Sequence, residues 1–211
     1  MFPKYPKINT LFKREETKPC NIIIGDYTYP EFEQIKYWQV QEKIDGTNIR
    51  IHWNGTEVII GGRTDAAQLH NALVLELQRL FPIEKMQAEF PDIGSDSCVT
   101  LYGEGYGAGI QAGGNYRATP SFILFDIRVG RWWLTRDACL DIAYKLSIPI
   151  VPVICQHMHT HDIIEYVMEK PKSACSLIEQ ISEGIVAKTD LLMRNGERLW
   201  FKLKVKDFKC S

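Results

Sequence analysis

Five short segments of this 211-residue chain combine lysine, arginine and carboxylate side chains with glycines, a composition that suits chemistry on phosphates. The first is residues 42–48 (EKIDGTN), in which Lys43 ends a predicted strand directly before an Asp-Gly turn. A free lysine has a pKa of about 10.4, so at neutral pH it is protonated and is not a nucleophile. Lowering such a pKa by ~3 units takes roughly 4 kcal/mol from nearby cations or desolvation. Nearby carboxylates act in the opposite direction, so a metal ion or other basic groups must dominate if Lys43 attacks phosphorus. The competing interpretation is a solvated lysine in a surface turn.

The second and third segments are residues 61–64 (GGRT) and 102–109 (YGEGYGAG). Arg63 could reach a phosphate with its bidentate fork, although an exposed turn would use the same residues. The glycines of the third segment partly match a loose dinucleotide-binding fingerprint. We reject that match because Glu104 would put a carboxylate inside the anion-binding turn. We expect instead a strand that ends at Glu104, with the carboxylate directed at a sugar hydroxyl or a metal, followed by a flexible glycine loop.

The fourth segment, residues 122–128 (FILFDIR), has the pattern of a core strand. A carboxylate within it, at Asp126, needs a partner if it is buried. The neighbouring Phe125 could stack on a base while Asp126 orients the lysine or a metal-bound water.

The fifth segment has two parts, residues 183–188 (EGIVAK) and 200–206 (WFKLKVK). Lys202, Lys204 and Lys206 alternate, so on a strand they project from one face. Like charges in a row repel unless an anion lies opposite, which indicates a phosphate site. The alternative is a solvated edge strand on which lysines discourage aggregation.

Composition limits the class of protein. The chain is 45% hydrophobic and has a formal net charge of -1, which excludes a long-range electropositive field but not a local basic patch. It has no uninterrupted apolar run of about 18 residues and no apolar N-terminal segment, so we expect no membrane partner and no secretory signal. None of the six cysteines forms a CxxC pair, which fits a reducing compartment. These observations predict a cytoplasmic, globular protein.

Strand-like and helix-like stretches are interspersed along the chain. Asn54-Gly55 between two β-prone runs predicts a hairpin, and leucines at helical spacing predict a helix over 65–81 with Asp65 as its N-cap. Further strands are expected at 37–43, 99–102, 122–129, 131–134, 185–187 and 199–205, and further helices at 137–146 and 162–168. Hairpins outnumber strand-helix-strand units, so we predict an α+β fold with mainly antiparallel sheets flanked by helices.

Taken in order, these motifs resemble the covalent nucleotidyltransferase superfamily, which contains ATP-dependent DNA ligases, RNA ligases and mRNA capping enzymes. The resemblance spans 42–206 and rests on Lys43-x-Asp45-Gly46, Glu104, Phe125-Asp126, Glu183-Gly184 and Lys202-x-Lys204. Thr47-Asn48, Gly62-Arg63-Thr64 and Lys202-Leu203-Lys204 make it most similar to small, phage-like RNA ligases of the RNA ligase 2 type. The resemblance implies a nucleotidyltransferase (ATP-grasp-like) domain.

The resemblance also implies a role for each residue. Lys43 would attack the α-phosphorus of ATP and carry AMP, with Lys202 and Lys204 on the α-phosphate. The residues expected to bind the nucleotide are Glu42, Lys43, Asn48, Arg63, Glu104, Phe125, Glu183, Lys202 and Lys204. Those expected on the metal side, partly through water, are Asp45, Asp126 and Glu183, with Mg²⁺ or Mn²⁺ as the ion. Asp45, Glu183 and the three lysines would form the catalytic set.

The implied activity is ATP-dependent joining of 5′-phosphate and 3′-hydroxyl RNA ends, for example in phage RNA repair in the host cytoplasm. We expect a single adenylation domain over 1–211, with an N-terminal strap at 1–36 and no OB or helical C-terminal domain. A partner chain could supply RNA contacts, or the strap could, since Tyr5, Lys7 and Arg14 interleave aromatic and basic groups. The strap could equally be a cover for the core. The alternatives to an RNA ligase are a DNA ligase core, a guanylyltransferase, or a non-catalytic nucleotide- or RNA-binding module.

Overall fold

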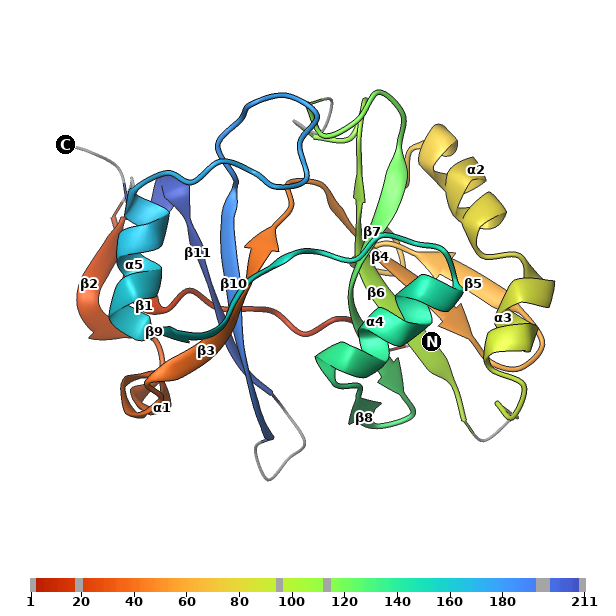
Figure 1. Ribbon diagram of the computed structural model, residues 1–211, viewed down its shortest axis with the longest axis horizontal. Helices are drawn as coiled ribbons and strands as arrows, with labels where there is room; N and C mark the ends of the chain where they lie inside the picture. Colours follow the sequence, from red (N-terminus) through yellow and green to blue (C-terminus); the bar gives the residue numbers. More distant parts are fainter. Residues whose placement is uncertain (1–2, 18–20, 94–96, 112–114, 193–197, 209–211) are drawn as a thin grey trace. The chain divides into compact units, whose positions relative to one another are not determined.

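The chain folds as two units that alternate along the sequence. Unit 1 comprises Met1–Pro6 and Asp45–Val151, and unit 2 comprises Lys7–Ile44 and Pro152–Ser211. The computed structural model describes residues 3–17, 21–93, 97–111, 115–192 and 198–208, with only the backbone of 190–192. Figure 1 labels the helices and strands of both units. In this described part, no helix is both long and apolar enough to cross a bilayer.

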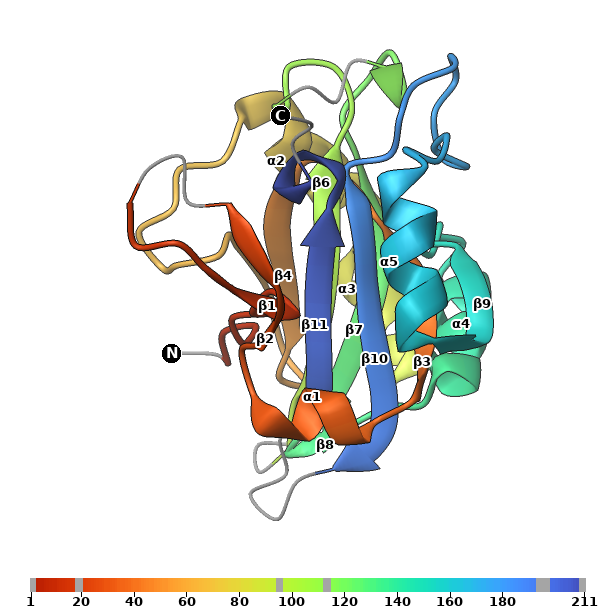
Figure 2. The same ribbon diagram turned by 90° about the vertical axis from the view of Figure 1, so that its left-hand side faces the viewer.

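Unit 2 contains a four-stranded antiparallel sheet in the order β11-β10-β3-β9. The strands are β3 (Tyr37–Lys43), β9 (Val153–His159), β10 (Gly184–Leu192) and β11 (Arg198–Lys204). The paired strands β10 and β11 run side by side in Figure 2. The remaining elements are β1 (Phe12–Arg14), β2 (Ile22–Tyr27), α1 (Pro30–Gln34), α5 (Thr160–Met168) and the 3-10 turn η2 (Val205–Asp207).

The core of unit 2 follows from alternation along these strands. Trp38 and Val40 of β3 are buried on the same face as Phe201 and Leu203 of β11, because side chains two residues apart project from one side of a strand. Helix α5 contacts β3, β9 and β11 and completes this core with apolar side chains at i and i+4. The opposite side chains of β11, Lys202 and Lys204, are therefore kept out of the core.

Unit 1 contains a five-stranded antiparallel sheet in the order β5-β4-β6-β7-β8. The strands are β4 (Thr47–Trp53), β5 (Val58–Gly61), β6 (Val99–Tyr106), β7 (Ser121–Val129) and β8 (Trp132–Trp133). The helices are α2 (Asn71–Leu80), α3 (Ile83–Glu89) and α4 (Arg136–Lys145). Helices α2 and α4 both pack against β7.

Apolar burial stabilises unit 1 on the helical face of this sheet. Ile49 and Ile51 of β4 and Leu73 and Leu77 of α2 are fully buried in one cluster. Each such side chain contributes about 1.5–3 kcal/mol when it leaves water. The sheet's other face is thus the one on which polar side chains of β4, β6 and β7 can meet a ligand.

The structure confirms the α+β class and the antiparallel sheets, and corrects two boundaries. The predicted helix over 65–81 is wrong at its start: α2 begins at Asn71, and Asp65 instead accepts a hydrogen bond from the buried Arg50 (2.9 Å). The strand expected to end at Glu104 continues to Tyr106, because its pairing with β4 extends to Gly105. The strands β1, β2 and β9 and the helices α1 and α3 were not predicted.

The segment expected as an N-terminal strap is shared between the units. Residues 3–6 belong to unit 1 and the described residues from Lys7 onward belong to unit 2, whereas residues 1–2 and 18–20 lie outside the described part. Leu11, Phe12 and Phe32 are buried in the core of unit 2. For these three side chains, the interpretation as core cover is confirmed.

Candidate active site

The predicted nucleophile lies in a cluster of charges in unit 2. In the sheet, Gly184 of β10 pairs with Lys43 of β3 on one side and with Lys204 of β11 on the other. The Glu183 carboxylate accepts a hydrogen bond from Lys43 through Oε2 (2.6 Å) and another from Lys204 through Oε1. One carboxylate therefore joins two ammonium groups from strands that flank β10.

The Lys43–Glu183–Lys204 cluster is largely shielded from water. The side chains of Lys43, Glu183 and Lys204 are 21%, 15% and 19% exposed. Burial raises the pKa of Glu183, but the charge of Lys43 and hydrogen bonds from both lysines outweigh it, so the pKa is lowered overall. Glu183 is thus ionised at neutral pH, and the cluster as a whole carries excess positive charge that suits a phosphate.

A glycine is required next to Glu183 for this arrangement. Gly184 has φ of +150°, and a Cβ at this position would lie 2.1 Å from the carbonyl oxygen of Leu203 on β11. No other residue permits this approach of β10 to β11. The Glu-Gly pair singled out in the sequence is therefore a structural unit: the glycine allows the strand contact that brings Glu183 to Lys204.

Glu42, predicted to bind the nucleotide, has protein partners in unit 2. It is 4% exposed and accepts hydrogen bonds from the Ser173 hydroxyl (2.5 Å) and the Ala174 backbone N–H (3.0 Å). Burial raises its pKa, an effect that these two hydrogen bonds partly offset. Glu42 thus ties the segment before β10 to the strand that carries Lys43, and its contact with a nucleotide stays a prediction.

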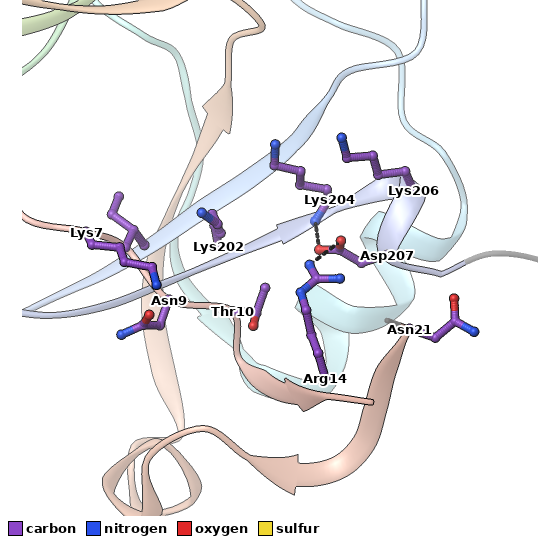
Figure 3. A pocket seen from close by; sticks show the side chains of 10 residues that line it. Lys7, Asn9, Thr10, Arg14, Asn21, Lys202, Lys204, Lys206 and Asp207 are labelled. Carbon is purple, nitrogen blue, oxygen red and sulfur yellow. Dashed lines mark hydrogen bonds and ion pairs between the residues drawn. The ribbon is translucent and has the colours of Figure 1, made fainter. Parts of the chain in front are cut away.

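Lys202 also lies in unit 2, on the edge strand β11. Its backbone N–H donates to the carbonyl of Asn9 (2.9 Å), which attaches the N-terminal segment to this edge. Together with Lys204 it lines a pocket of unit 2, which Figure 3 shows from close by.

The turn after Lys43 belongs to unit 1 and packs tightly against β6. A Cβ at Gly46 would lie 2.3 Å from the carbonyl oxygen of Gly105 and 2.8 Å from Cγ of Glu104. The backbone N–H of Asp45 lies 3.3 Å from the Tyr116 hydroxyl, to which it donates a hydrogen bond. The Asp-Gly sequence therefore serves close packing beside Glu104 as well as turn formation.

Asn48 and Glu104 face each other across the β4–β6 ladder. The buried Oδ1 atom of Asn48 finds no hydrogen-bond partner among the residues that the structure describes. Buried polar atoms are normally paired, so this oxygen is available to a hydroxyl or amino group of a ligand. The pair forms a polar position suited to the sugar of a nucleotide.

Phe125 and Asp126 lie at an irregularity of β7. Tyr102 pairs with Asp126 and Gly103 with Leu124, so Phe125 is the extra residue of the bulged strand. The ring of Tyr5 packs edge-on against Phe125 with centroids 4.8 Å apart, and the Tyr5 hydroxyl donates to the Asp126 carboxylate. Asp126 is 3% exposed and thus has the partner that a buried carboxylate needs.

Two contributors to these positions were missed from sequence. Tyr5 was considered only as part of a segment that could stack on single strands. Arg50 is fully buried and donates through Nε to the carbonyl of Gly62 (2.6 Å), the residue before the exposed Arg63. A charged residue amid the apolar alternation of 48–53 was the available signal for Arg50, whereas nothing local indicated the contacts of Tyr5.

The predicted metal ligands do not form a metal cage. Within the described residues, no three His, Cys, Asp or Glu side chains are grouped so as to hold an ion. Asp45 and Asp126 belong to unit 1 and Glu183 to unit 2. Magnesium usually keeps several waters and binds through one or two carboxylates plus substrate phosphates, so these residues fit an ion that arrives with a nucleotide.

Comparison with known proteins identifies the family. The sequence profile of the RNA ligase family matches residues 36–204, which include every residue predicted for the site. The chain belongs to the RNA ligase family. No curated protein sequence matches it.

Solved structures with a similar fold include several of an RNA ligase from Naegleria gruberi. A variant solved with ATP and Mn has a TM-score of 0.65 at 19% identity, covering 98% of this chain and 58% of that one. A variant with AMP and Mn gives 0.62 at 20%, covering 85% and 53%, and the ligase with pyrophosphate gives 0.61 at 20%, covering 82% and 50%. The chain spans somewhat more than half the length of these relatives, and the likeness confirms the predicted fold class.

Proposed function

We propose that this protein is an ATP-dependent RNA ligase that works through a covalent lysine–AMP intermediate. The observation that carries the proposal is the bridge of Glu183 between Lys43 and Lys204, within the region that matches the family. A phosphate-transfer site needs a nucleophile, cations for the phosphate charge and a group that positions both. These three side chains meet that requirement.

In the first step, Lys43 leaves its ion pair with Glu183, loses a proton and attacks the α-phosphorus of ATP through Nζ. A P–N bond forms, the bond between the α-phosphorus and the bridging oxygen breaks, and pyrophosphate leaves with that oxygen. Lys202 and Lys204 bind the α-phosphate oxygens and stabilise the charge that builds on them. Glu183 holds Lys204 in place and takes part on the metal side.

Residues of unit 1 bind the rest of the nucleotide in this proposal. Glu104 and Asn48 accept or donate hydrogen bonds to the ribose hydroxyls, which gives the unpaired Oδ1 of Asn48 a partner. Phe125 offers its ring to the adenine. Asp45 and Asp126 lie on the metal side, and Arg63 contacts the nucleotide or the RNA 5′-phosphate.

A bound Mg²⁺ or Mn²⁺ would neutralise phosphate charge, and the carboxylates present suit an ion coordinated mainly by phosphates and water. In the second step, an oxygen of the RNA 5′-phosphate attacks the AMP phosphorus, and Lys43 leaves and regains its proton. In the third, the 3′-hydroxyl loses its proton and attacks the RNA phosphorus, which releases AMP and closes the phosphodiester bond.

The test of the first step is label transfer from α-phosphate-labelled ATP to the purified chain, with labelled GTP alongside. Lys43→Ala should abolish the adduct, and the exposed Lys36→Ala on the same unit should leave it unchanged. A Lys43-dependent, acid-labile adduct from ATP supports the proposal. An adduct from GTP points to a guanylyltransferase, and no adduct at all points to a non-catalytic binding module.

The nucleic-acid step needs a second experiment. Nicked RNA duplexes, free RNA ends and the corresponding DNA substrates are offered to the adenylylated protein, and joined product is measured. We expect product with RNA, and product with DNA alone would favour a DNA ligase core. Because the chain spans about half the length of its structural relatives, we also propose that a partner chain improves grip on RNA, which its addition in the same assay measures.

A further inference from the structure

Unit 2 contains a pocket that the nucleotide chemistry does not fully use. It has a volume of about 550 Å³ and lies along β11 and the N-terminal segment (Figure 3). Its charged lining consists of Lys7, Arg14, Lys202, Lys204, Lys206 and Asp207. We call this the basic pocket.

The backbone explains how these cations come together. Lys202 and Lys204 project from β11 on the side opposite its core residues, and Lys206 follows in η2. The N-terminal segment runs parallel to this edge through the bridge between Thr10 and Lys202, which brings Lys7 to the pocket. Side chains from the two ends of the chain thus form one cavity.

The charges of the basic pocket are not balanced by its own acid. Asp207 accepts a hydrogen bond from Arg14 Nη2 (2.6 Å) and another from the Lys204 backbone N–H (2.9 Å), so it supports the pocket wall. Five cationic side chains thus face one carboxylate, and that carboxylate already has partners. Like charges this close repel one another unless an anion lies between them, so the pocket is suited to a ligand with several negative charges.

Two observations favour a nucleic-acid strand over the polyphosphate of ATP. Lys7, Arg14 and Lys206 lie outside residues 36–204, the region that carries the family's nucleotide chemistry. The neutral part of the lining includes Asn9, Thr10 and Asn21, whose amides and hydroxyl can meet sugars and base edges. Pyrophosphate offers no such groups.

We propose that the basic pocket binds the backbone phosphates of a 5′-phosphorylated RNA strand, next to the Lys43–Glu183–Lys204 cluster. Lys204 belongs to both, since its side chain lines the pocket and its ammonium group pairs with Glu183. A strand in the pocket therefore lies beside the lysine that carries AMP. This assignment rests on the proposed function and adds to it the subsite that holds the RNA donor strand.

The test compares two double variants of the full chain. Lys7→Ala/Lys206→Ala removes two exposed charges from the pocket, and Lys36→Ala/Lys172→Ala removes two exposed charges elsewhere on unit 2. The dissociation constant for a fluorescent, 5′-phosphorylated oligoribonucleotide is measured without ATP over a salt series. The pocket variant should bind at least about tenfold more weakly, with a salt slope reduced by about 2, because each lost phosphate contact reduces it by about 1.

The outcomes separate this assignment from the proposed function. The pocket variant should keep the rate of label transfer from ATP, and that of AMP release by pyrophosphate, within about twofold of the unsubstituted protein. Unchanged RNA affinity, or a loss equal to that of the control variant, overturns the RNA assignment. Slowed label transfer or pyrophosphate discharge, with RNA binding intact, overturns it in favour of an ATP polyphosphate site. If the unsubstituted protein forms no adduct, the ligase proposal fails, and the RNA comparison still decides what the basic pocket binds.

Discussion

The two units solve different recognition problems with different side chains. In unit 2, Lys43, Glu183 and Lys204 form a nearly buried network of charges at the ends of neighbouring strands. In unit 1, Tyr5 and Phe125 meet through their rings beside a buried carboxylate. The first arrangement suits phosphate chemistry and the second suits an aromatic base.

The difference shows how each kind of group is kept ready for a ligand. Charged side chains in unit 2 are oriented by opposite charge, so their geometry depends on the ionisation of Glu183. The rings of unit 1 are oriented by packing, which is insensitive to pH and salt. Substitutions in unit 2 should therefore affect the chemical step, and those in unit 1 should affect affinity or stability.

The largest effect is expected for Glu183→Gln. A neutral amide cannot balance the ammonium groups of Lys43 and Lys204, so we expect the rate of lysine–AMP formation at saturating ATP to fall on the order of 100-fold. Glu179→Gln, which breaks an exposed ion pair with Lys172, is the matched control and should change the rate less than twofold. A loss of less than threefold in Glu183→Gln would show that the charge network does not serve the chemical step.

Phe125→Ala should instead weaken ATP binding. Loss of a stacking ring costs about 1–3 kcal/mol per base, so the KM for ATP in adduct formation should rise about tenfold or more. The rate at saturating ATP should change little, because the cluster in unit 2 is intact. Phe125→Tyr keeps the ring and should behave like the unsubstituted protein, and a fall in the saturated rate for Phe125→Ala would contradict this division of roles.

Tyr5→Phe tests the support of the acidic position in unit 1. The variant keeps the ring packed on Phe125 but removes the hydroxyl that donates to the buried Asp126 carboxylate. We expect a loss of about 1 kcal/mol in the free energy of unfolding, measured by urea denaturation. Tyr37→Phe at an exposed tyrosine should have no effect, and equal stability of the two variants would mean that the Tyr5 hydroxyl contributes nothing.

The smallest effect is expected for Glu42→Gln, and it depends on pH. The pKa of Glu42 is raised in the folded state, so its ionisation costs stability as pH rises through that pKa. A glutamine does not ionise, so at pH 7 the variant should melt slightly higher, by no more than about 2 °C. The difference should vanish below pH ~4, where the unfolded chain's glutamate is also protonated. A lower melting temperature at pH 7 would show that the charge on Glu42 stabilises the fold.

Part of the fold could be predicted from local pattern. Strands β3 and β4 and the hairpin at Asn54-Gly55 follow from alternation and turn chemistry, and the structure has them. The start of α2 was predicted wrongly because Asp65 is a good N-cap in isolation, whereas the buried Arg50 pairs with it in the fold. A local rule lost to a tertiary ion pair. The role of the site residues and the phage-like origin stay predictions.

The sequence by itself determined the order of the motifs, the family and the class of fold, because these depend on residue type and short-range spacing. Only the tertiary structure decided which charges meet. Lys43 and Glu183 are 140 positions apart and Tyr5 and Asp126 are 121 apart, and their contacts depend on how each unit's distant segments pack. The basic pocket likewise needs both ends of the chain, brought together on β11 by backbone hydrogen bonds that no local pattern encodes.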